Sequence, residues 1–370
     1  MARIGFLSHS DTSLHLFRRP IMQALKDAGH EVFAIAPKGD YTDEVAADFH
    51  LVAYELDRVS LNPLKVITDT NSLAQTLEIL NLDLLQTSAH KSNVFGTFAA
   101  KKAGIKHVIN LVEGLGSFYI DNDLKTRLVR YAIERLYKMS LKRSDGCVFV
   151  NDADPEYFLS HKLIKEDKIY KIKSVGVDTH KFDPNVINAT KISDKKIVLM
   201  IARAIWHKGV REFYKAAEIL KDRNDCEFVY VGGLDDNKSA ANLEFLQSGN
   251  VRYLGPRNDI AELLKACYVF VLPSYKEGFP RTILEAMSMG KAVVTTDVQG
   301  CNEAVSACVN GLLCRVADGA NLAEKIECLL DDEPLCVRLG QNGRDMAVKE
   351  FDERDIAQKY IEIYRKFIDV

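Results

Sequence analysis

Two carboxylates, Glu277 and Glu285, stand eight residues apart where an apolar run gives way to a helix. Residues 269–272 have the continuous apolar character of a strand covered on both faces, Pro280 suits a helix start, and Gly290 suits a helix end. Helix starts beyond parallel strands bind anions through backbone amides. Amides combined with two carboxylates suit a ligand that carries both phosphates and hydroxyls, such as a nucleotide sugar. The alternative is that both glutamates are solvated charges at a helix entry.

Arg203 and Lys208 follow a second apolar segment, residues 196–204, and Gly209 leads from them into the next helix. A planar guanidinium binds two phosphate oxygens and an ammonium acts as a point charge, so this pair predicts a diphosphate clamp. Such a clamp stabilises the negative charge that grows on a leaving nucleoside diphosphate. The alternative, a pair of surface cations, is disfavoured because an unpaired charge closing an apolar strand is costly. Gly232, at the end of another apolar run, suits close approach of a ligand.

His90 and Glu113 are the candidates from the first half of the chain, since each follows an expected strand, residues 82–89 and 107–114. Ligands of open parallel sheets lie beyond these strand ends. Glu113 is suited to act as a general base toward an acceptor hydroxyl, or to stabilise positive charge on a donor sugar. We favour a functional role for Glu113 because charged groups at sheet ends cluster in sites. His90 fits a catalytic role and a loop anchor equally well.

Residues 122–144 predict a basic amphipathic helix, with apolar positions at Leu124, Leu128, Ile133, Leu136, Tyr137 and Leu141. Such helices are typical of membrane-surface elements, where each cation contributes about 1 kcal/mol near an anionic leaflet. Arg18 and Arg19 would extend the same surface. The alternative is an ordinary packed helix with a solvated basic face. The residues expected at the membrane or the acceptor are Arg127, Arg130, Arg135 and Lys138.

The composition indicates a two-domain globular protein, because 370 residues exceed what one core usually serves. The net charge of −3 gives no pull toward nucleic acid. The start of the chain reads as a strand rather than a signal peptide, and no apolar run approaches the roughly 20 residues that span a bilayer. The eight cysteines form no C-x-x-C pair, which favours reduced thiols in a cytosolic protein.

Alternating strands and helices predict an α/β fold of two doubly wound, Rossmann-like domains facing across a cleft. We expect an N-terminal acceptor- and membrane-facing domain over residues 1–184 and a polar linker over 185–195. A C-terminal nucleotide-sugar-binding domain should occupy residues 196–351. The last helix, about 352–370, should pack back on the first domain.

The same stretches carry a resemblance that covers nearly the whole chain. The matching motifs are ARAIWHKG at 202–209, VGG at 231–233, YLGPRNDI at 253–260, the segment 268–290 with its E-x7-E pair, and NGLL at 310–313. With these motifs the chain resembles the family-4 retaining glycosyltransferases of the GT-B fold. The resemblance implies that Arg203 and Lys208 bind the donor diphosphate and that Glu285 binds the ribose hydroxyls. It implies that Glu277, with the Gly278 and Phe279 amides, binds the donor sugar and phosphate.

Glu113 departs from the family pattern, since many members carry a histidine there. The resemblance further implies UDP-N-acetylgalactosamine as donor and undecaprenyl-diphosphate-linked N,N'-diacetylbacillosamine as acceptor. The expected reaction is α-1,3 transfer in lipid-linked oligosaccharide assembly for protein N-glycosylation. The expected location is the cytoplasmic face of the bacterial cell membrane, on which the protein would be peripheral.

No cofactor and no metal are expected, because no D-x-D-type loop lies near the phosphates, and the adjacent Asp235 and Asp236 are interpreted as solvated loop acids. The alternatives are another family-4 transferase with a different UDP-sugar or acceptor, a sugar-nucleotide epimerase, and a non-catalytic lipid-sugar binding protein. An epimerase would turn over the donor without an acceptor, and a binding protein would lack the intact set of donor residues.

Overall fold

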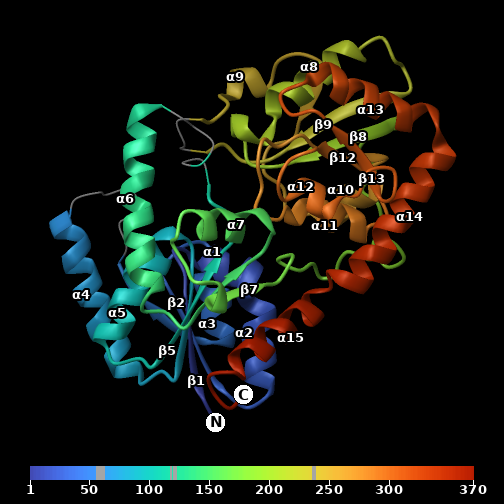
Figure 1. The fold of residues 1–370 in the computed structure, drawn as a ribbon. Coiled ribbons are helices and arrows are strands. Elements are labelled where there is room, and N and C mark those ends of the chain that lie inside the picture. The colour runs from blue at the N-terminus through green and yellow to red at the C-terminus, as the bar shows by residue number, and fades with distance from the viewer. Residues whose placement is uncertain (56–62, 117–118, 120–122, 236–238) are drawn as a thin grey trace. The chain divides into compact units, whose positions relative to one another are not determined.

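The computed structural model describes residues 1–55, 63–116, 119, 123–235 and 239–370 (Figure 1). It divides into two compact units, which we call the first and second domains. The first domain comprises Met1–Val175 and Arg354–Val370, and the second comprises Gly176–Glu353. This division differs from the expected boundaries, because residues 176–184 belong to the second domain. The polar segment 185–195 lies inside the second domain and contains neither helix nor strand.

The first domain is built on a seven-stranded parallel sheet with the order β3-β2-β1-β4-β5-β6-β7. Its strands are β1 (Arg3–Leu7), β2 (Glu31–Ala36), β3 (His50–Ala53), β4 (Leu84–Ser88), β5 (His107–Val112), β6 (Gly146–Phe149) and β7 (Ile169–Lys171). The central strands are apolar and buried on both faces, as expected for a parallel sheet covered by helices. The short strand β7 was not predicted from the sequence.

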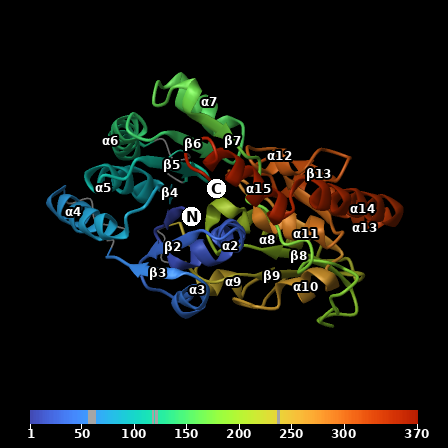
Figure 2. The ribbon, with the colours of Figure 1, turned by 90° about the horizontal axis from the view of Figure 1, so that it is seen from below.

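Helices cover both faces of this sheet. The first domain contains α1 (Asp11–Ser13), η1 (Leu14–Arg18), α2 (Arg19–Asp27), α3 (Thr42–Asp48), α4 (Pro63–Leu80), η2 (Ser92–Gly96), α5 (Thr97–Lys102), α6 (Leu124–Leu141), α7 (Ala153–Ser160), η4 (Glu166–Lys168) and, from Arg354 on, α15 (Glu353–Tyr364). In Figures 1 and 2, α4, α5 and α6 lie on one face of the sheet and α2 and α15 on the other. Phe6 of β1 contacts Tyr364 of α15 with ring centroids 6.4 Å apart, so the C-terminal helix is part of this core.

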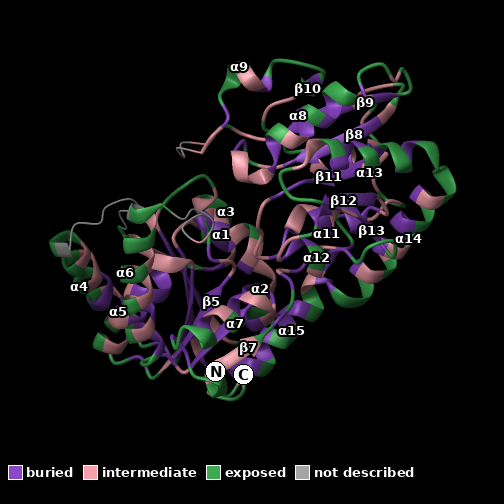
Figure 3. Ribbon diagram, turned by 45° about the horizontal axis from the view of Figure 1, so that its top comes forward, coloured by how far each residue is buried: buried purple, intermediate pink, exposed green. Residues whose placement is uncertain are grey.

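The second domain is built on a six-stranded parallel sheet with the order β10-β9-β8-β11-β12-β13. Its strands are β8 (Lys196–Ile201), β9 (Cys226–Val231), β10 (Val251–Tyr253), β11 (Val269–Leu272), β12 (Ala292–Thr296) and β13 (Gly311–Cys314). Its helices are η5 (Trp206–Lys208), α8 (Val210–Ile219), α9 (Leu243–Leu246), α10 (Ile260–Ala266), α11 (Arg281–Ser288), α12 (Cys301–Ala304), α13 (Gly319–Asp331) and α14 (Glu333–Glu350). Figure 3 shows that the strands are mostly buried, whereas the helices carry both buried and exposed residues.

Two segments expected as regular helix contain π-helical turns, η1 (Leu14–Arg18) and η2 (Ser92–Gly96). A π-turn inserts one extra residue per turn and re-aims the side chains that follow it, and such turns are frequent at functional sites. The turn η1 ends at Arg18, whose side chain is 1% exposed. The sequence interpretation that Arg18 adds to a membrane surface is therefore wrong.

Candidate active site

The second domain places its candidate donor residues at the point where the strand order reverses. Strands β8 and β11 are neighbours there, although α8, β9, β10 and α10 separate them in sequence. Arg203 and Lys208 follow the carboxyl end of β8, and Glu277 follows the carboxyl end of β11. Open α/β sheets bind ligands outside the strand ends at this switch point. The topology thus brings together residues that are about 70 positions apart in the chain.

Lys208 and Glu277 form a partly buried ion pair at this edge. Lys208 Nζ donates to Glu277 Oε1 over 2.5 Å, and the two side chains are 22% and 11% exposed. Ser274 Oγ donates to the same oxygen over 2.6 Å. The loops can approach this closely because Gly209 has φ +78°, and a Cβ there would lie 2.0 Å from the Pro273 carbonyl oxygen. The structure therefore places two of the residues predicted to bind the donor substrate in direct contact.

Arg203 has a different environment from the one expected. Strand β8 ends at Ile201, so Arg203 lies beyond it with a side chain that is 67% exposed. Its guanidinium donates to Asp235 Oδ2 over 2.9 Å, and Asp235 itself is 18% exposed. The sequence argument against a surface position for Arg203 was wrong, because Arg203 does not close the strand. The interpretation of Asp235 as a solvated loop acid was also wrong. Asp236 lies outside the described residues. Exposure leaves Arg203 accessible to a diphosphate, with Asp235 as its partner in this structure.

Glu285 lies in α11, whose N-cap is Pro280 and whose end is marked by Gly290 at φ +67°. Arg281 Nε donates to Glu285 Oε1 over 3.2 Å, and the two side chains are 19% and 12% exposed. Burial raises the pKa of Glu285, and the charge of Arg281 opposes this effect. Hydrogen-bond donors stabilise a carboxylate that is buried in this way, and ribose hydroxyls would supply such donors.

The loop before α11 is fixed by apolar packing and by a close backbone approach. Phe279 is 6% exposed and lies against Phe351 with ring centroids 5.5 Å apart. A Cβ on Gly300 would lie 2.7 Å from the Gly278 carbonyl oxygen. The glycine at 232 also has a structural reason, since a Cβ there would lie 1.8 Å from the Ala202 carbonyl oxygen. Position 232 must therefore be a glycine, because the chain just after β9 packs too closely against the chain just after β8 to admit a side chain.

Glu113 follows β5 in the first domain and pairs with Arg18. The Arg18 Nη2 atom donates to Glu113 Oε1 over 2.7 Å, and the side chains are 1% and 25% exposed. The guanidinium lies 5.8 Å from the ring centroid of Tyr360, and Tyr364 is fully buried in the same helix. Burial acts to lower the pKa of Arg18, but Glu113 and Tyr360 outweigh it and leave that pKa raised. Among the described residues, Glu113 Oε2 has no hydrogen bond.

His90 has both ring nitrogens engaged within the first domain. Nδ1 lies 2.8 Å from the Tyr137 hydroxyl and Nε2 lies 3.2 Å from the Leu115 carbonyl oxygen. A carbonyl only accepts, so Nε2 carries the proton and Nδ1 accepts from Tyr137. Burial lowers the pKa of His90, which favours this neutral form. The geometry favours the loop-anchor interpretation, because His90 holds the segment that follows Glu113.

Helix α6 presents a mixed face rather than a purely basic one. Its inward side includes Ile133, Leu136, Tyr137 and Leu141, which pack into a core of the first domain. Leu124 and Leu128 were expected on that apolar side, but they are 73% and 64% exposed. They share the outer surface with these other exposed side chains: Arg127, Tyr131, Arg135 and Met139.

The remaining two basic residues of the predicted surface are half-buried. Arg130 lies 5.3 Å from the ring centroid of Tyr119, and Lys138 is partly covered. Arg19, which was expected to extend the surface, pairs with Asp48.

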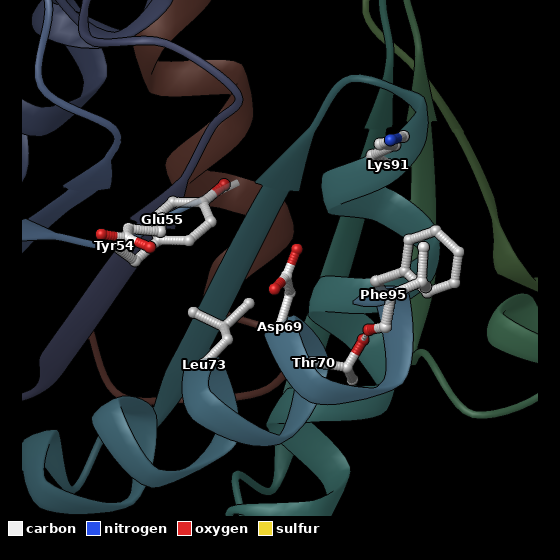
Figure 4. A pocket seen from close by; sticks show the side chains of 8 residues that line it. Tyr54, Glu55, Asp69, Thr70, Leu73, Lys91 and Phe95 are labelled. Carbon is white, nitrogen blue, oxygen red and sulfur yellow. Dashed lines mark hydrogen bonds between the residues drawn. The ribbon is translucent and has the colours of Figure 1, made fainter. Parts of the chain in front are cut away.

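A small pocket that sequence reasoning missed lies in the first domain between the end of β3, the start of α4 and the start of η2 (Figure 4). Its lining combines charged and apolar side chains: Tyr54, Glu55, Val66, Asp69, Thr70, Leu73, Lys91 and Phe95. No motif could reveal it, because the lining comes from three separate segments. Tyr54 and Lys91 come after the carboxyl ends of β3 and β4, so the pocket lies at that edge of the first sheet.

Two further properties bear on the expected chemistry. Within the described ranges, no three or more histidine, cysteine, aspartate or glutamate side chains are grouped as a metal site would require. None of the helices in the described part of the chain has the length and apolar character needed to cross a bilayer.

Comparison with known proteins identifies the class. Residues 183–346 match the family described as glycosyl transferases group 1, and residues 3–151 match the family described as glycosyl transferase 4-like. With its two doubly wound parallel-sheet domains, the chain belongs to the family-4-like glycosyltransferases of the GT-B fold.

Within that class, a relative named for a specific reaction is similar over 99% of the chain. The sequence is 49% identical to the N,N'-diacetylbacillosaminyl-diphospho-undecaprenol alpha-1,3-N-acetylgalactosaminyltransferase of Campylobacter jejuni, over 99% of both proteins. It is 27% identical to the UDP-Gal:alpha-D-GlcNAc-diphosphoundecaprenol alpha-1,3-galactosyltransferase of Escherichia coli, over 89% of this chain and 86% of that one.

Solved structures share the fold. A glycosyltransferase from Rickettsia africae has a TM-score of 0.79 at 22% identity, with coverage of 98% of this chain and 97% of that one. An Anabaena protein in complex with UDP-glucose has a TM-score of 0.78 at 18% identity, with coverage of 99% and 100%.

Proposed function

We propose that this enzyme transfers N-acetylgalactosamine from UDP-N-acetylgalactosamine to undecaprenyl-diphosphate-linked N,N'-diacetylbacillosamine and forms an α-1,3 linkage. The observation that carries this proposal is the 49% identity to the Campylobacter jejuni enzyme over 99% of both chains. The more distant Escherichia coli relative is also named for α-1,3 transfer to a sugar on diphosphoundecaprenol. The shared acceptor class supports a lipid-linked sugar as substrate, in the assembly of a lipid-linked oligosaccharide for protein N-glycosylation.

The donor would be held by residues at the switch point of the second domain. Lys208 and Arg203 supply cations for the diphosphate, whose negative charge increases as the sugar departs. Lys208 is neutralised by Glu277 in this structure, at 2.5 Å. Binding of a diphosphate therefore shifts Lys208 toward phosphate and leaves Glu277 to accept hydrogen bonds from sugar hydroxyls. Glu285 accepts from the ribose, and neither a metal nor another cofactor is assigned a role.

The acceptor would lie at the first domain. Glu113 has one oxygen bonded to Arg18, at 2.7 Å, while no described residue bonds the other. That second oxygen is suited to accept the proton or the hydrogen bond of the attacking hydroxyl.

The outer face of α6 supports peripheral attachment to the inner face of the bacterial cell membrane. Leu124, Leu128 and Tyr131 are 73%, 64% and 57% exposed, which is unusual for large apolar side chains at neighbouring positions of one helix face. The exposed Arg127 and Arg135 lie among them. Apolar side chains that enter a leaflet and cations that meet anionic headgroups together give interfacial binding. Substitution of Leu128 and Tyr131 by glutamate should reduce binding to anionic vesicles while leaving UDP binding intact.

A transfer assay tests the proposal. Polyprenyl-diphosphate-linked bacillosamine is incubated with UDP-GalNAc, UDP-GlcNAc, UDP-galactose or UDP-glucose in parallel. Product with UDP-GalNAc alone is expected. Product with another UDP-sugar would keep the family and its cation pair but overturn the named donor. Epimerised UDP-sugar formed without acceptor would favour the epimerase alternative.

Lys208→Ala gives the matched test of the donor site. It should weaken UDP binding by about tenfold or more, since it removes a charge-assisted contact to phosphate. Lys221→Ala is the control, because that lysine pairs with Glu218 on an exposed surface of the same domain. Equal UDP affinity of the Lys208 variant and the wild type would remove Lys208 from the diphosphate site.

A further inference from the structure

Arg281 occupies a position that is electrostatically unfavourable for a cation. It is the first residue of α11, where the helix dipole places partial positive charge. Its side chain is nevertheless only 19% exposed, so it is not simply solvated at the surface. A largely buried guanidinium at a helix N-terminus needs carboxylate partners to stay there.

Two carboxylates meet this need. Arg281 Nε donates to Glu285 Oε1 over 3.2 Å, one turn further along the helix. Its Nη2 atom lies 3.9 Å from Glu353 Oε2 in the chain segment that leaves the second domain. Glu285 and Glu353 are 12% and 21% exposed. Arg281 is therefore fixed between the carboxylate expected at the ribose and a second carboxylate behind it.

Glu285 requires such a cation to act as an acceptor. A carboxylate accepts hydrogen bonds through both oxygens when ionised, whereas its protonated form must place a hydrogen on one of them. Burial raises the pKa of Glu285, and the opposing charges are those of Arg281 and Lys181. The remaining charged groups of this cluster, Glu353 with Asp178 and Asp352 beside it, are all acidic.

We propose that Arg281 is a positioning residue for donor binding, which orients Glu285 and supplies the counter-charge that lets it accept the ribose hydroxyls of the nucleotide. This inference rests on the proposed ribose role of Glu285. It assigns to Arg281 an effect on the ribose end of the donor, although the residue stands at a helix start that would also suit a phosphate ligand. The two roles predict different affinities. A phosphate ligand contributes equally to the binding of nucleotides with and without the 2′-hydroxyl, whereas a residue that acts through Glu285 contributes more when the hydroxyl is present.

The test compares the dissociation constants of UDP and 2′-deoxy-UDP, measured by calorimetry near pH 6 and near pH 8. The ratio of the two constants reports the contribution of the ribose hydroxyl. The proteins are the wild type, Glu285→Gln, Arg281→Gln, the charge-retaining Arg281→Lys, and Arg315→Gln. Arg315 serves as the control because its side chain is 73% exposed and pairs locally with Asp318.

The wild type should prefer UDP by about tenfold, the size of one hydrogen bond to a charged group. Arg281→Gln should lose most of this preference, and the loss should be greater at the lower pH, since burial raises the pKa of Glu285 and the variant lacks the cation that opposes this effect. Arg281→Lys should keep more of the preference than Arg281→Gln, which also shows that the site is folded.

Three outcomes would overturn the inference. Equal weakening of UDP and 2′-deoxy-UDP by Arg281→Gln would make Arg281 a phosphate ligand, and wild-type affinity for both nucleotides would make it structural. A wild type that does not prefer UDP, together with an unaffected Glu285→Gln variant, would instead reject the ribose role of Glu285 itself. The last result is distinct from the first two because it appears without any change at Arg281.

Discussion

Arg18 and Glu113 form an ion pair at 2.7 Å across 95 residues of sequence, and the arginine is 1% exposed while the glutamate is 25% exposed. The candidate catalytic carboxylate is therefore also the partner of a buried cation. The π-helical turn η1 delivers Arg18 to this place, and Tyr360 of the C-terminal helix lies against its guanidinium. Glu113 is tied to the stability of the first domain as well as to its chemistry.

Replacement of Glu113 by glutamine should destabilise the first domain by about 2–4 kcal/mol, because it leaves a buried arginine without its counter-charge. The measurement is the free energy of unfolding in denaturant, alongside the rate of transfer. A double variant, Glu113→Gln with Arg18→Met, should regain much of the stability but none of the activity. If Glu113→Gln unfolds like the wild type, the ion pair contributes nothing and only a catalytic or neutral role remains.

His90 should behave as an anchor and not as the acid or base of the reaction. His90→Gln retains a donor for the Leu115 carbonyl and should keep most of the activity, whereas His90→Ala should slow transfer and cost about 1 kcal/mol of stability. Burial lowers the pKa of His90, so the imidazole stays neutral near pH 7. The pH profile of kcat/KM should then be the same for wild type and His90→Gln. Disappearance of an acidic limb in the variant would assign proton transfer to His90.

Two glycines of the second domain should respond very differently to alanine. At Gly232 a Cβ would lie 1.8 Å from a backbone oxygen, so Gly232→Ala should cost more than about 3 kcal/mol. At Gly290 the space is open and only the φ of +67° is strained, so Gly290→Ala should cost about 1 kcal/mol. Thermal denaturation of the two variants checks this contrast. Equal losses would mean that the strand ends of β8 and β9 separate easily.

Glu353 should make the stability of the second domain depend on pH. Burial raises its pKa to about 7, with Asp178 and Asp352 adding to the effect against Arg281 and Lys181. The folded state thus binds a proton more tightly than the unfolded state, so the free energy of unfolding falls as pH rises from about 5 to 7. The full effect is at most about 3 kcal/mol.

Glu353→Gln should flatten this pH dependence and raise stability near pH 8. Denaturant unfolding at several pH values provides the measurement. A variant whose slope with pH matches that of the wild type would show that other groups titrate.

Several features of the fold and site could be predicted from residue patterns, because they depend on residues that are close together in the sequence. The apolar run of β11, the proline at 280 and the glycine at 290 each act on their own segment, and the expected strand and helix were confirmed. The motifs are short and specific enough to predict the family and the GT-B fold, and the comparisons confirmed both. The roles assigned to Glu277 and Glu285 stay predictions.

Features that depend on partners distant in sequence were not predicted. The sequence predicts a strand that reaches Arg203, whereas β8 ends at Ile201 and the partner Asp235 comes from another loop. Arg18 stands four residues after Leu14 and three before Ile21, which is the spacing of one helix face, and that signal marks it as inward-facing. The pairing of Arg18 with Glu113 has no such signal, because only the tertiary fold sets it.

The cysteines divide unevenly between the domains and between surface and core. All eight are free thiols, with Cys308 and Cys328 exposed and the others buried. Cys147 belongs to the first domain, and five buried cysteines belong to the second. A buried thiol reacts with an alkylating reagent only when its surroundings open. Brief alkylation followed by mass spectrometry therefore times the opening of each domain separately in the unmodified enzyme, with Cys308 and Cys328 as internal standards for full reactivity.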